Sequence, residues 1–132
     1  MNKEELKLKL KKYDYHYKER FDKIIVNLDS TLEIEIDYSV PDKVIITDKL
    51  RGYNMLTGVW STSVKGAIIL NMVFSFFYFL IYAFLSYSIN KPFVNYLTLI
   101  IFVLGMAWII LWTNYYLVKS ENFKTLVQSW DR

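Results

Sequence analysis

One long stretch of this chain is nearly free of charge. Between Gly66 and Val118 there are 53 residues, and Lys91 is the only charged one among them. A water-soluble domain of 132 residues would leave much of such a stretch on its surface and would not stay dispersed. A disordered chain would not reach 54% hydrophobic residues. The stretch therefore predicts an α-helical integral membrane protein.

The stretch divides into two apolar runs, residues 67–89 and 93–118. Each is longer than the ~20 residues that a helix needs to cross about 30 Å of hydrocarbon. The Asn90-Lys91-Pro92 sequence between them is typical of a turn and is too short for a domain. Residues 66–118 are therefore expected to form two transmembrane helices packed as an antiparallel hairpin.

Basic residues gather at the two ends of the hairpin that lie away from this turn. They are Lys49, Arg51, Lys65, Lys119 and Lys124. Because positively charged flanks usually stay on the cytoplasmic side, both termini are expected to be cytoplasmic and the turn to lie outside. The expected location is the cell (inner) membrane, with an organellar membrane as the alternative.

The region before the apolar stretch, residues 1–65, has a different periodicity. Apolar and polar residues alternate in it, which indicates half-buried strands, at about 23–28, 31–38 and 43–48. These would form a short antiparallel meander and give the cytoplasmic region an α+β fold. Three strands alone are barely stable in water, so another segment must cover their apolar face.

Residues 2–22 are the first candidate for this cover, and their pattern is ambiguous. Asn2 and Glu5 fit a helix N-cap with its reciprocal acidic residue. Leucines and tyrosines between positions 6 and 17 also alternate at period two, which is typical of a strand. We expect a helix over 2–22 and keep the strand as the alternative.

Two further segments are amphipathic and are expected at the membrane surface. In residues 52–65, apolar side chains recur at helical spacing and include Trp60. In the tail, residues 119–132, the apolar face of an amphipathic helix includes Phe123 and Trp130. These three aromatic residues are candidate membrane anchors. Packing of the tail against the protein's own strands is the alternative.

The first apolar run has a polar side. At about 100° per residue, five polar side chains lie on one side of the expected helix: Asn71, Ser75, Tyr78, Tyr82 and Ser86. Phe77 and Phe84 lie on the opposite side, which suits lipid. Lipid cannot satisfy hydroxyl and amide groups, so the polar side is expected to face protein or a hydrated gap.

The second apolar run has small or polar residues on two faces. Thr98 and Gly105 share one face, and Ala107 and Asn114 lie nearly opposite. One face can serve the hairpin partner, and if it is the second, Asn71 and Asn114 lie at similar depth and can pair. The other face would then point outward and favour contact with a second protein or a second copy.

Side chains that carry catalysis are scarce. His16 is the only histidine, there is no cysteine, and the glycines are too scattered for a phosphate-binding loop. Glu33, Glu35 and Asp37 are expected on one strand face as a solvated surface, with an acidic cation site as the alternative. The net charge of +3 is too small to favour nucleic-acid binding. The sequence predicts no enzyme, no cofactor and no metal site.

These observations favour a non-catalytic accessory or regulatory subunit. Its expected partners are membrane lipids and either other membrane subunits or further copies of itself, contacted through the polar residues of the two runs. The alternative is an oligomeric effector that perturbs membranes or forms a channel under the control of its cytoplasmic region.

Overall fold

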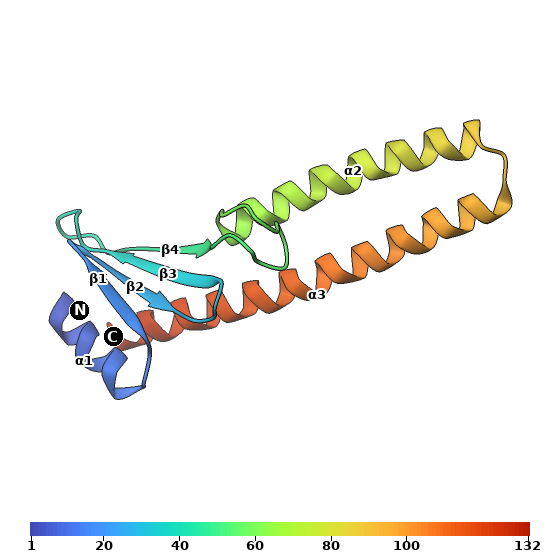
Figure 1. The fold of residues 1–132 in the computed structure, drawn as a ribbon. Coiled ribbons are helices and arrows are strands. Elements are labelled where there is room, and N and C mark those ends of the chain that lie inside the picture. The colour runs from blue at the N-terminus through green and yellow to red at the C-terminus, as the bar shows by residue number, and fades with distance from the viewer.

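The computed structural model describes residues 1–132 as a small sheet domain attached to a long pair of helices (Figure 1). The two parts lie end to end, and both chain termini are at the sheet domain. The elements in chain order are α1 (Lys3–Lys12), β1 (Tyr17–Arg20), β2 (Lys23–Asn27), β3 (Leu32–Asp37), β4 (Ile45–Leu50), α2 (Val64–Ser88) and α3 (Pro92–Trp130).

The sheet is an antiparallel meander of four strands in the order β1-β2-β3-β4. Neighbouring strands pair in register, with Ile24 opposite Ile36 for example. Alternate residues of β2 and β3 are buried, as the period-two pattern predicted. Strand β4 begins two residues later than predicted. The turn at Pro41 continues through Lys43, whose N–H donates to the Val40 carbonyl.

The expectation of a helix over residues 2–22 is correct only for its first half. The Asn2 side chain accepts a hydrogen bond from the first turn, and α1 ends at Lys12. Asp14 then takes a left-handed backbone conformation, with a φ of 57°, which short polar residues tolerate. Beyond it β1 pairs with β2, so the period-two pattern around Tyr17 marks a strand. The hydrogen bonds offered by β2 outweigh a weak local preference for helix.

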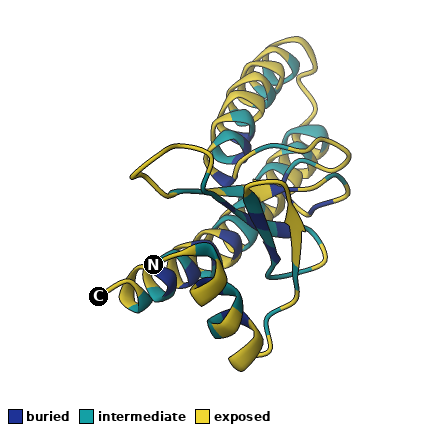
Figure 2. Ribbon diagram, turned by 90° about the vertical axis from the view of Figure 1, so that its left-hand side faces the viewer, coloured by how far each residue is buried: buried dark blue, intermediate teal, exposed yellow.

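The apolar face of the sheet is covered by α1 and by the C-terminal end of α3 (Figure 2). Eight buried side chains form this core: Leu6, Leu10, Ile24, Val26, Ile34, Ile36, Phe123 and Val127. The tail is therefore the end of α3 and not a separate helix on a membrane surface. It supplies the cover that the strands need.

Two of the three expected membrane anchors thus have another place in the structure. Phe123 is 3% exposed, and its ring packs edge-on against Tyr15, so it has no surface to offer to lipid. Trp130 packs against the same core and stacks on Tyr13, with the ring centroids 5.3 Å apart. Packing against the sheet removes more of this apolar area from water than a surface position would. Trp60 remains exposed.

The segment between β4 and α2 forms no helix, although its apolar side chains recur at helical spacing. Leu50 and Thr62 pair at its base, and we call the intervening residues 52–61 the 52–61 loop. Tyr53 and Gly58 have left-handed backbone conformations, which turn the chain back on itself.

Helices α2 and α3 lie side by side and antiparallel, joined by a short turn (Figure 1). Each contains a segment that is long and apolar enough to cross a membrane, and hardly any residue of these segments is buried. Helix α3 has 39 residues and α2 has 25. At ~1.5 Å per residue, α3 therefore continues about 20 Å past the start of α2. That extension carries the sheet domain.

Asp48 joins the sheet to both long helices. Its carboxylate accepts hydrogen bonds from the Val64 N–H at the start of α2 (2.9 Å) and from the Lys124 ammonium of α3 (2.6 Å). The Ser120 hydroxyl lies 3.3 Å from the same carboxylate. Burial alone would raise the pKa of Asp48, but these donors outweigh it and hold the pKa below the ordinary value of 3.8.

Replacing Phe123 with alanine is expected to destabilise the sheet domain by about 3–5 kcal/mol, because it leaves a cavity between α3 and the sheet. Phe93→Ala is the matched control, since Phe93 is exposed near the other end of α3. Urea unfolding of the detergent-solubilised protein, followed by near-ultraviolet circular dichroism, measures the difference. Equal midpoints for the two variants would contradict the buried position of Phe123.

The lowered pKa of Asp48 predicts a pH dependence of stability. The ionised carboxylate stabilises the fold at neutral pH, and this contribution is lost as the pH falls below about 4. Asp48→Asn is expected to be about 1–3 kcal/mol less stable near pH 7, because the Lys124 ammonium loses its anionic partner. Melting temperatures recorded on acidification should fall less steeply for Asp48→Asn than for the wild type. Asp42→Asn, in an exposed turn, is the control and should follow the wild type.

Candidate functional site

The polar side of α2 faces α3. Its five residues are buried or partly buried there: Asn71, Ser75, Tyr78, Tyr82 and Ser86. The opposite side of α2, which includes Phe77, is exposed. The Tyr78 hydroxyl donates to the Thr98 carbonyl (3.2 Å), and the Ser75 hydroxyl lies 3.4 Å from the Met106 sulfur. The polar side is therefore used first of all for contact within the hairpin.

Helix α3 turns the first of its two predicted faces toward α2. Thr98 and Trp112 are partly buried, whereas Ala107 and Asn114 are exposed on the outer side. Gly105 lies at the edge of the contact, and nothing lies within 4 Å of the place that a Cβ would take. It therefore does not mark a close approach of the two helices. Instead it lines a small hollow of about 220 Å³.

Asn71 does not pair with Asn114. Its amide nitrogen donates instead to the carbonyl oxygens of Leu56 (3.0 Å) and Ala67 (2.9 Å). Leu56 belongs to the 52–61 loop, so Asn71 ties this loop to α2. The pairing required the second face of α3 to be the inner one, whereas Asn114 lies toward the outer side of α3.

A groove of about 480 Å³ runs between α2 and α3, and we call it the lateral groove. The 52–61 loop lies against Trp108, and at about 100° per residue Ile110 is about 160° away from Trp108 around α3. The loop and the groove are therefore on opposite sides of the hairpin. The groove is lined by Ile68, Asn71, Met72, Ser75, Met106, Ile109, Ile110, Thr113 and Asn114.

Four polar side chains converge on the lateral groove. Asn71, Ser75 and Asn114 are residues that the sequence singled out, and the structure brings them together. Thr113 was missed, and its hydroxyl oxygen is buried without a hydrogen-bond partner in the chain. Thr113 could have been noticed as a polar residue in an apolar run. Which way its side chain points, however, is known only once the inner face of α3 is known. The other expected interface residues lie outside this groove: Tyr78, Tyr82, Ser86, Thr98, Gly105 and Ala107.

The composition of the lateral groove indicates what it can bind. Its walls are apolar, and its polar groups are amides and hydroxyls. Such groups form hydrogen bonds between helices in apolar surroundings, where no water competes for them. The groove therefore suits another apolar helix that offers a polar or small side chain at this level.

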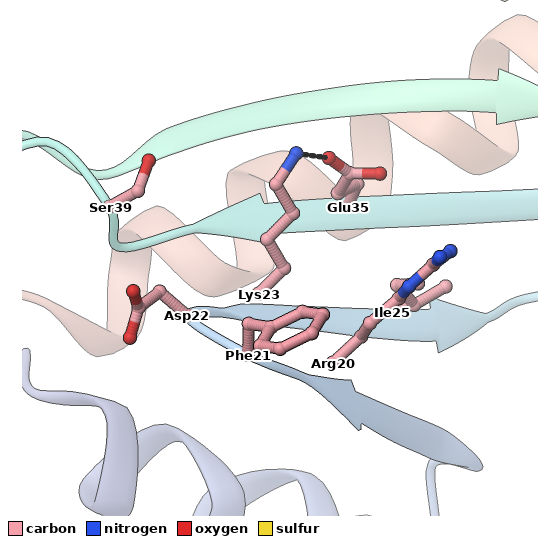
Figure 3. A pocket seen from close by; sticks show the side chains of 7 residues that line it. All are labelled: Arg20, Phe21, Asp22, Lys23, Ile25, Glu35 and Ser39. Atoms are coloured by element: carbon pink, nitrogen blue, oxygen red, sulfur yellow. Dashed lines mark hydrogen bonds and ion pairs between the residues drawn. The ribbon is translucent and has the colours of Figure 1, made fainter.

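A second hollow, of about 320 Å³, lies on the outer face of the sheet near the β1–β2 turn (Figure 3). The Lys23 ammonium lies across it and pairs with Glu35 (2.5 Å) and Asp37 (3.3 Å). Arg51 pairs with Glu33 (3.2 Å). Each of the three carboxylates of β3 is therefore paired with a cation. No group of acidic, histidine or cysteine residues in the chain is arranged to hold a metal ion.

No known protein family, curated protein or solved structure matches this chain. Its function has to be inferred from its own residues. Among them, the lateral groove combines a hollow with the exposed amide of Asn114, whereas in the hollow on the sheet Lys23 and Glu35 are paired with each other.

Asn71→Leu is expected to release the 52–61 loop. The Leu56 carbonyl would lose its donor in buried surroundings, at a cost of about 1–3 kcal/mol. Chymotrypsin, which cleaves after aromatic residues, should then cut at Tyr53 and Trp60 faster than in the wild type. Met72→Leu, at the neighbouring exposed position, is the control. Unchanged cleavage in Asn71→Leu would show that this amide does not hold the loop.

Proposed function

We propose that this chain is a non-catalytic membrane protein, an accessory or regulatory subunit that binds a membrane-spanning helix of another subunit or of a second copy of itself. The contact is made through the lateral groove and the adjoining outer face of α3, which carries Val103, Ala107, Ile110 and Asn114. The observation that carries this proposal is the exposed Asn114 at the edge of the lateral groove, in an otherwise apolar segment.

Insertion of the two long helices in a bilayer is supported by their exposed surface. Their outward side chains are apolar along both segments, and little of either segment is buried against the sheet domain. Soluble monomers rarely expose contiguous apolar patches larger than a few hundred Å². A bilayer removes this surface from water, and both helices exceed the ~20 residues that crossing requires.

Hydrocarbon surroundings leave the exposed Asn114 amide without the partner that water would provide. Lipid tails neither donate nor accept hydrogen bonds, so polar side chains at this level are usually satisfied by another helix. Each such hydrogen bond contributes about 0.6–2 kcal/mol to helix association. Ala107 lies seven residues before Asn114 on the same face, and its small side chain lets a second backbone come close.

The charge distribution supports a cytoplasmic position for both termini and the sheet domain. Lys65 lies at the start of α2, and Lys119 and Lys124 lie where α3 leaves its apolar segment. The turn at the other end of the hairpin has only Lys91. An excess of basic residues of this kind usually remains on the cytoplasmic side, which suits the cell (inner) membrane.

A photoreactive amino acid at Ile110 tests the proposal in intact membranes. We expect it to form a cross-linked adduct with a second copy or with another membrane subunit, because Ile110 lies one helical turn from Asn114 on the outer face of α3. Adding Asn114→Leu should weaken the association about three- to twentyfold, since it removes a contact of about 0.6–1.7 kcal/mol. The yield of the adduct, measured by mass spectrometry, reports this loss.

The same photoreactive residue at Phe84, on the opposite side of α2, is the control and should give no protein adduct. Equal adducts at both positions, or an adduct at Ile110 that Asn114→Leu leaves unchanged, would contradict a directed contact. The alternative of a channel-forming effector requires the polar side of α2 to leave α3 and line a lumen. Dye leakage from vesicles containing the purified protein would favour that alternative.

A further inference from the structure

The 52–61 loop exposes apolar side chains and has no charge. No acidic or basic residue lies between positions 51 and 65. Tyr53 is 84% exposed, Val59 64% and Trp60 54%. We propose that this loop is inserted at the boundary between the lipid headgroups and the acyl chains, as a third membrane element beside the two long helices. The partner that it fits is the lipid of the same bilayer.

Tyr53 presents its side chain outward from a turn of the loop. Its φ of 64° is left-handed, a conformation that costs about 1–2 kcal/mol for a residue with a side chain. The turn leaves the Tyr53 ring almost free of contacts within the chain. A tyrosine ring with its hydroxyl suits the headgroup level of a bilayer.

The middle of the loop, residues 54–58, is hydrogen-bonded within the protein. Asn54 and Gly58 exchange two backbone hydrogen bonds, of 3.0 and 3.1 Å. The buried Asn54 side chain also donates to the Trp60 carbonyl (3.1 Å) and accepts from the N–H groups of Leu56 and Thr57. It donates to the Arg51 carbonyl as well (2.8 Å). One side chain thus contacts four backbone groups that would otherwise need water.

The two long helices supply donors to two further carbonyls of the loop. Trp108 Nε1 donates to the Met55 carbonyl (2.9 Å), and Asn71 Nδ2 donates to the Leu56 carbonyl (3.0 Å). In water these carbonyls would be hydrated, whereas in hydrocarbon an unpaired carbonyl costs several kcal/mol. Donors placed on the apolar helices are therefore what a loop inserted beside them requires.

The contacts place the loop beside the apolar segments and not at their charged ends. In Figure 1 it lies next to the start of α2 and reaches toward α3. The Trp60 ring stacks on Phe74, with the centroids 6.0 Å apart, and Phe74 lies ten residues beyond Val64. Ten residues of helix span about 15 Å. Helices that lie in the membrane interface are buried about 5–10 Å below the headgroup level. The loop reaches such a depth when Lys65, at the start of α2, lies among the headgroups.

Insertion of the loop would set the height of the sheet domain above the bilayer. The loop joins β4 directly to α2 and pairs at its base through Leu50 and Thr62. The inference rests on the membrane placement proposed above, but it requires no protein partner. A failure of the loop to contact lipid can therefore be distinguished from a failure of the hairpin to insert.

The absence of cysteine allows a nitroxide spin label to be placed at one introduced cysteine. Tyr53→Cys and Val59→Cys report on the loop, Phe84→Cys on α2, and Phe21→Cys on the exposed β1–β2 turn of the sheet domain. The proteins are reconstituted in vesicles of phosphatidylcholine with a minority of phosphatidylglycerol. Power saturation then compares collisions with oxygen, which concentrates in lipid, and with a nickel chelate, which stays in water.

We expect the oxygen-to-nickel ratio at Tyr53→Cys and Val59→Cys to be several-fold above that at Phe21→Cys and closer to that at Phe84→Cys. A ratio in the loop equal to that at Phe21→Cys, with a lipid-like ratio at Phe84→Cys, would overturn the inference alone. A water-like ratio at Phe84→Cys as well would overturn the membrane placement. Protection of the loop labels from both reagents would mean that a protein covers the loop, and it would also overturn the inference.

A second measurement avoids any substitution in the strained part of the loop. Tryptophan fluorescence of the wild type and of Trp60→Phe is compared in vesicles whose lipids carry bromine near the headgroup end of the acyl chain. The emission lost in Trp60→Phe is the contribution of Trp60, and we expect bromine to quench it because Trp60 is exposed on the protein surface. A Trp60 contribution that bromine leaves unquenched would contradict the insertion of Trp60.

Discussion

One face of α3 packs first against α2 and then, further along the helix, against the sheet. The rest of the structure depends on this change of packing partner. Its first part packs on α2, and beyond Tyr116 the same face packs under the sheet through Phe123 and Val127. Tyr116 is buried where the partner changes. Its hydroxyl lies 3.2 Å from the Thr31 hydroxyl and accepts a hydrogen bond from the Met55 N–H. Because the helix is uninterrupted, the orientation of the sheet domain follows from that of the hairpin.

This arrangement divides the polar groups near the hairpin into two classes. Asn71 and Trp108 donate hydrogen bonds to carbonyls of the 52–61 loop, and Asp48 accepts hydrogen bonds where the sheet meets both long helices. Thr113 has no partner in the chain, and Asn114 is exposed. The first class holds the fold together. In the second, the exposed Asn114 amide is open to another molecule, whereas the Thr113 hydroxyl is enclosed within the hairpin. In apolar surroundings this difference has a large energetic weight, because no water replaces a missing partner.

Much of the fold could be predicted from local patterns, and the errors have a common cause. The two apolar helices, their turn and the alternation in β2 and β3 agree with the sequence-based expectations. The helix expected over residues 2–22 ends early because β2 offers hydrogen bonds to the second half of that segment. In the candidate site, Asn71, Ser75 and Asn114 were predicted as polar residues in apolar runs, and all three line the lateral groove. Their separate roles were not predictable. Asn71 bonds to the 52–61 loop, and the sequence pattern of this loop had indicated a helix instead.

The sequence by itself determined that this chain has two apolar helices of spanning length, alternating strands before them, and a polar side on the first helix. These properties follow from charge and periodicity within single segments. Only the tertiary structure decided which face of α3 is the inner one, that its end covers the sheet, and that Asn71 holds the 52–61 loop while Asn114 stays exposed. The physical reason is that segments far apart in the chain compete for the same apolar surfaces and the same hydrogen-bonding groups. The outcome of that competition depends on their positions in space and not on any local pattern.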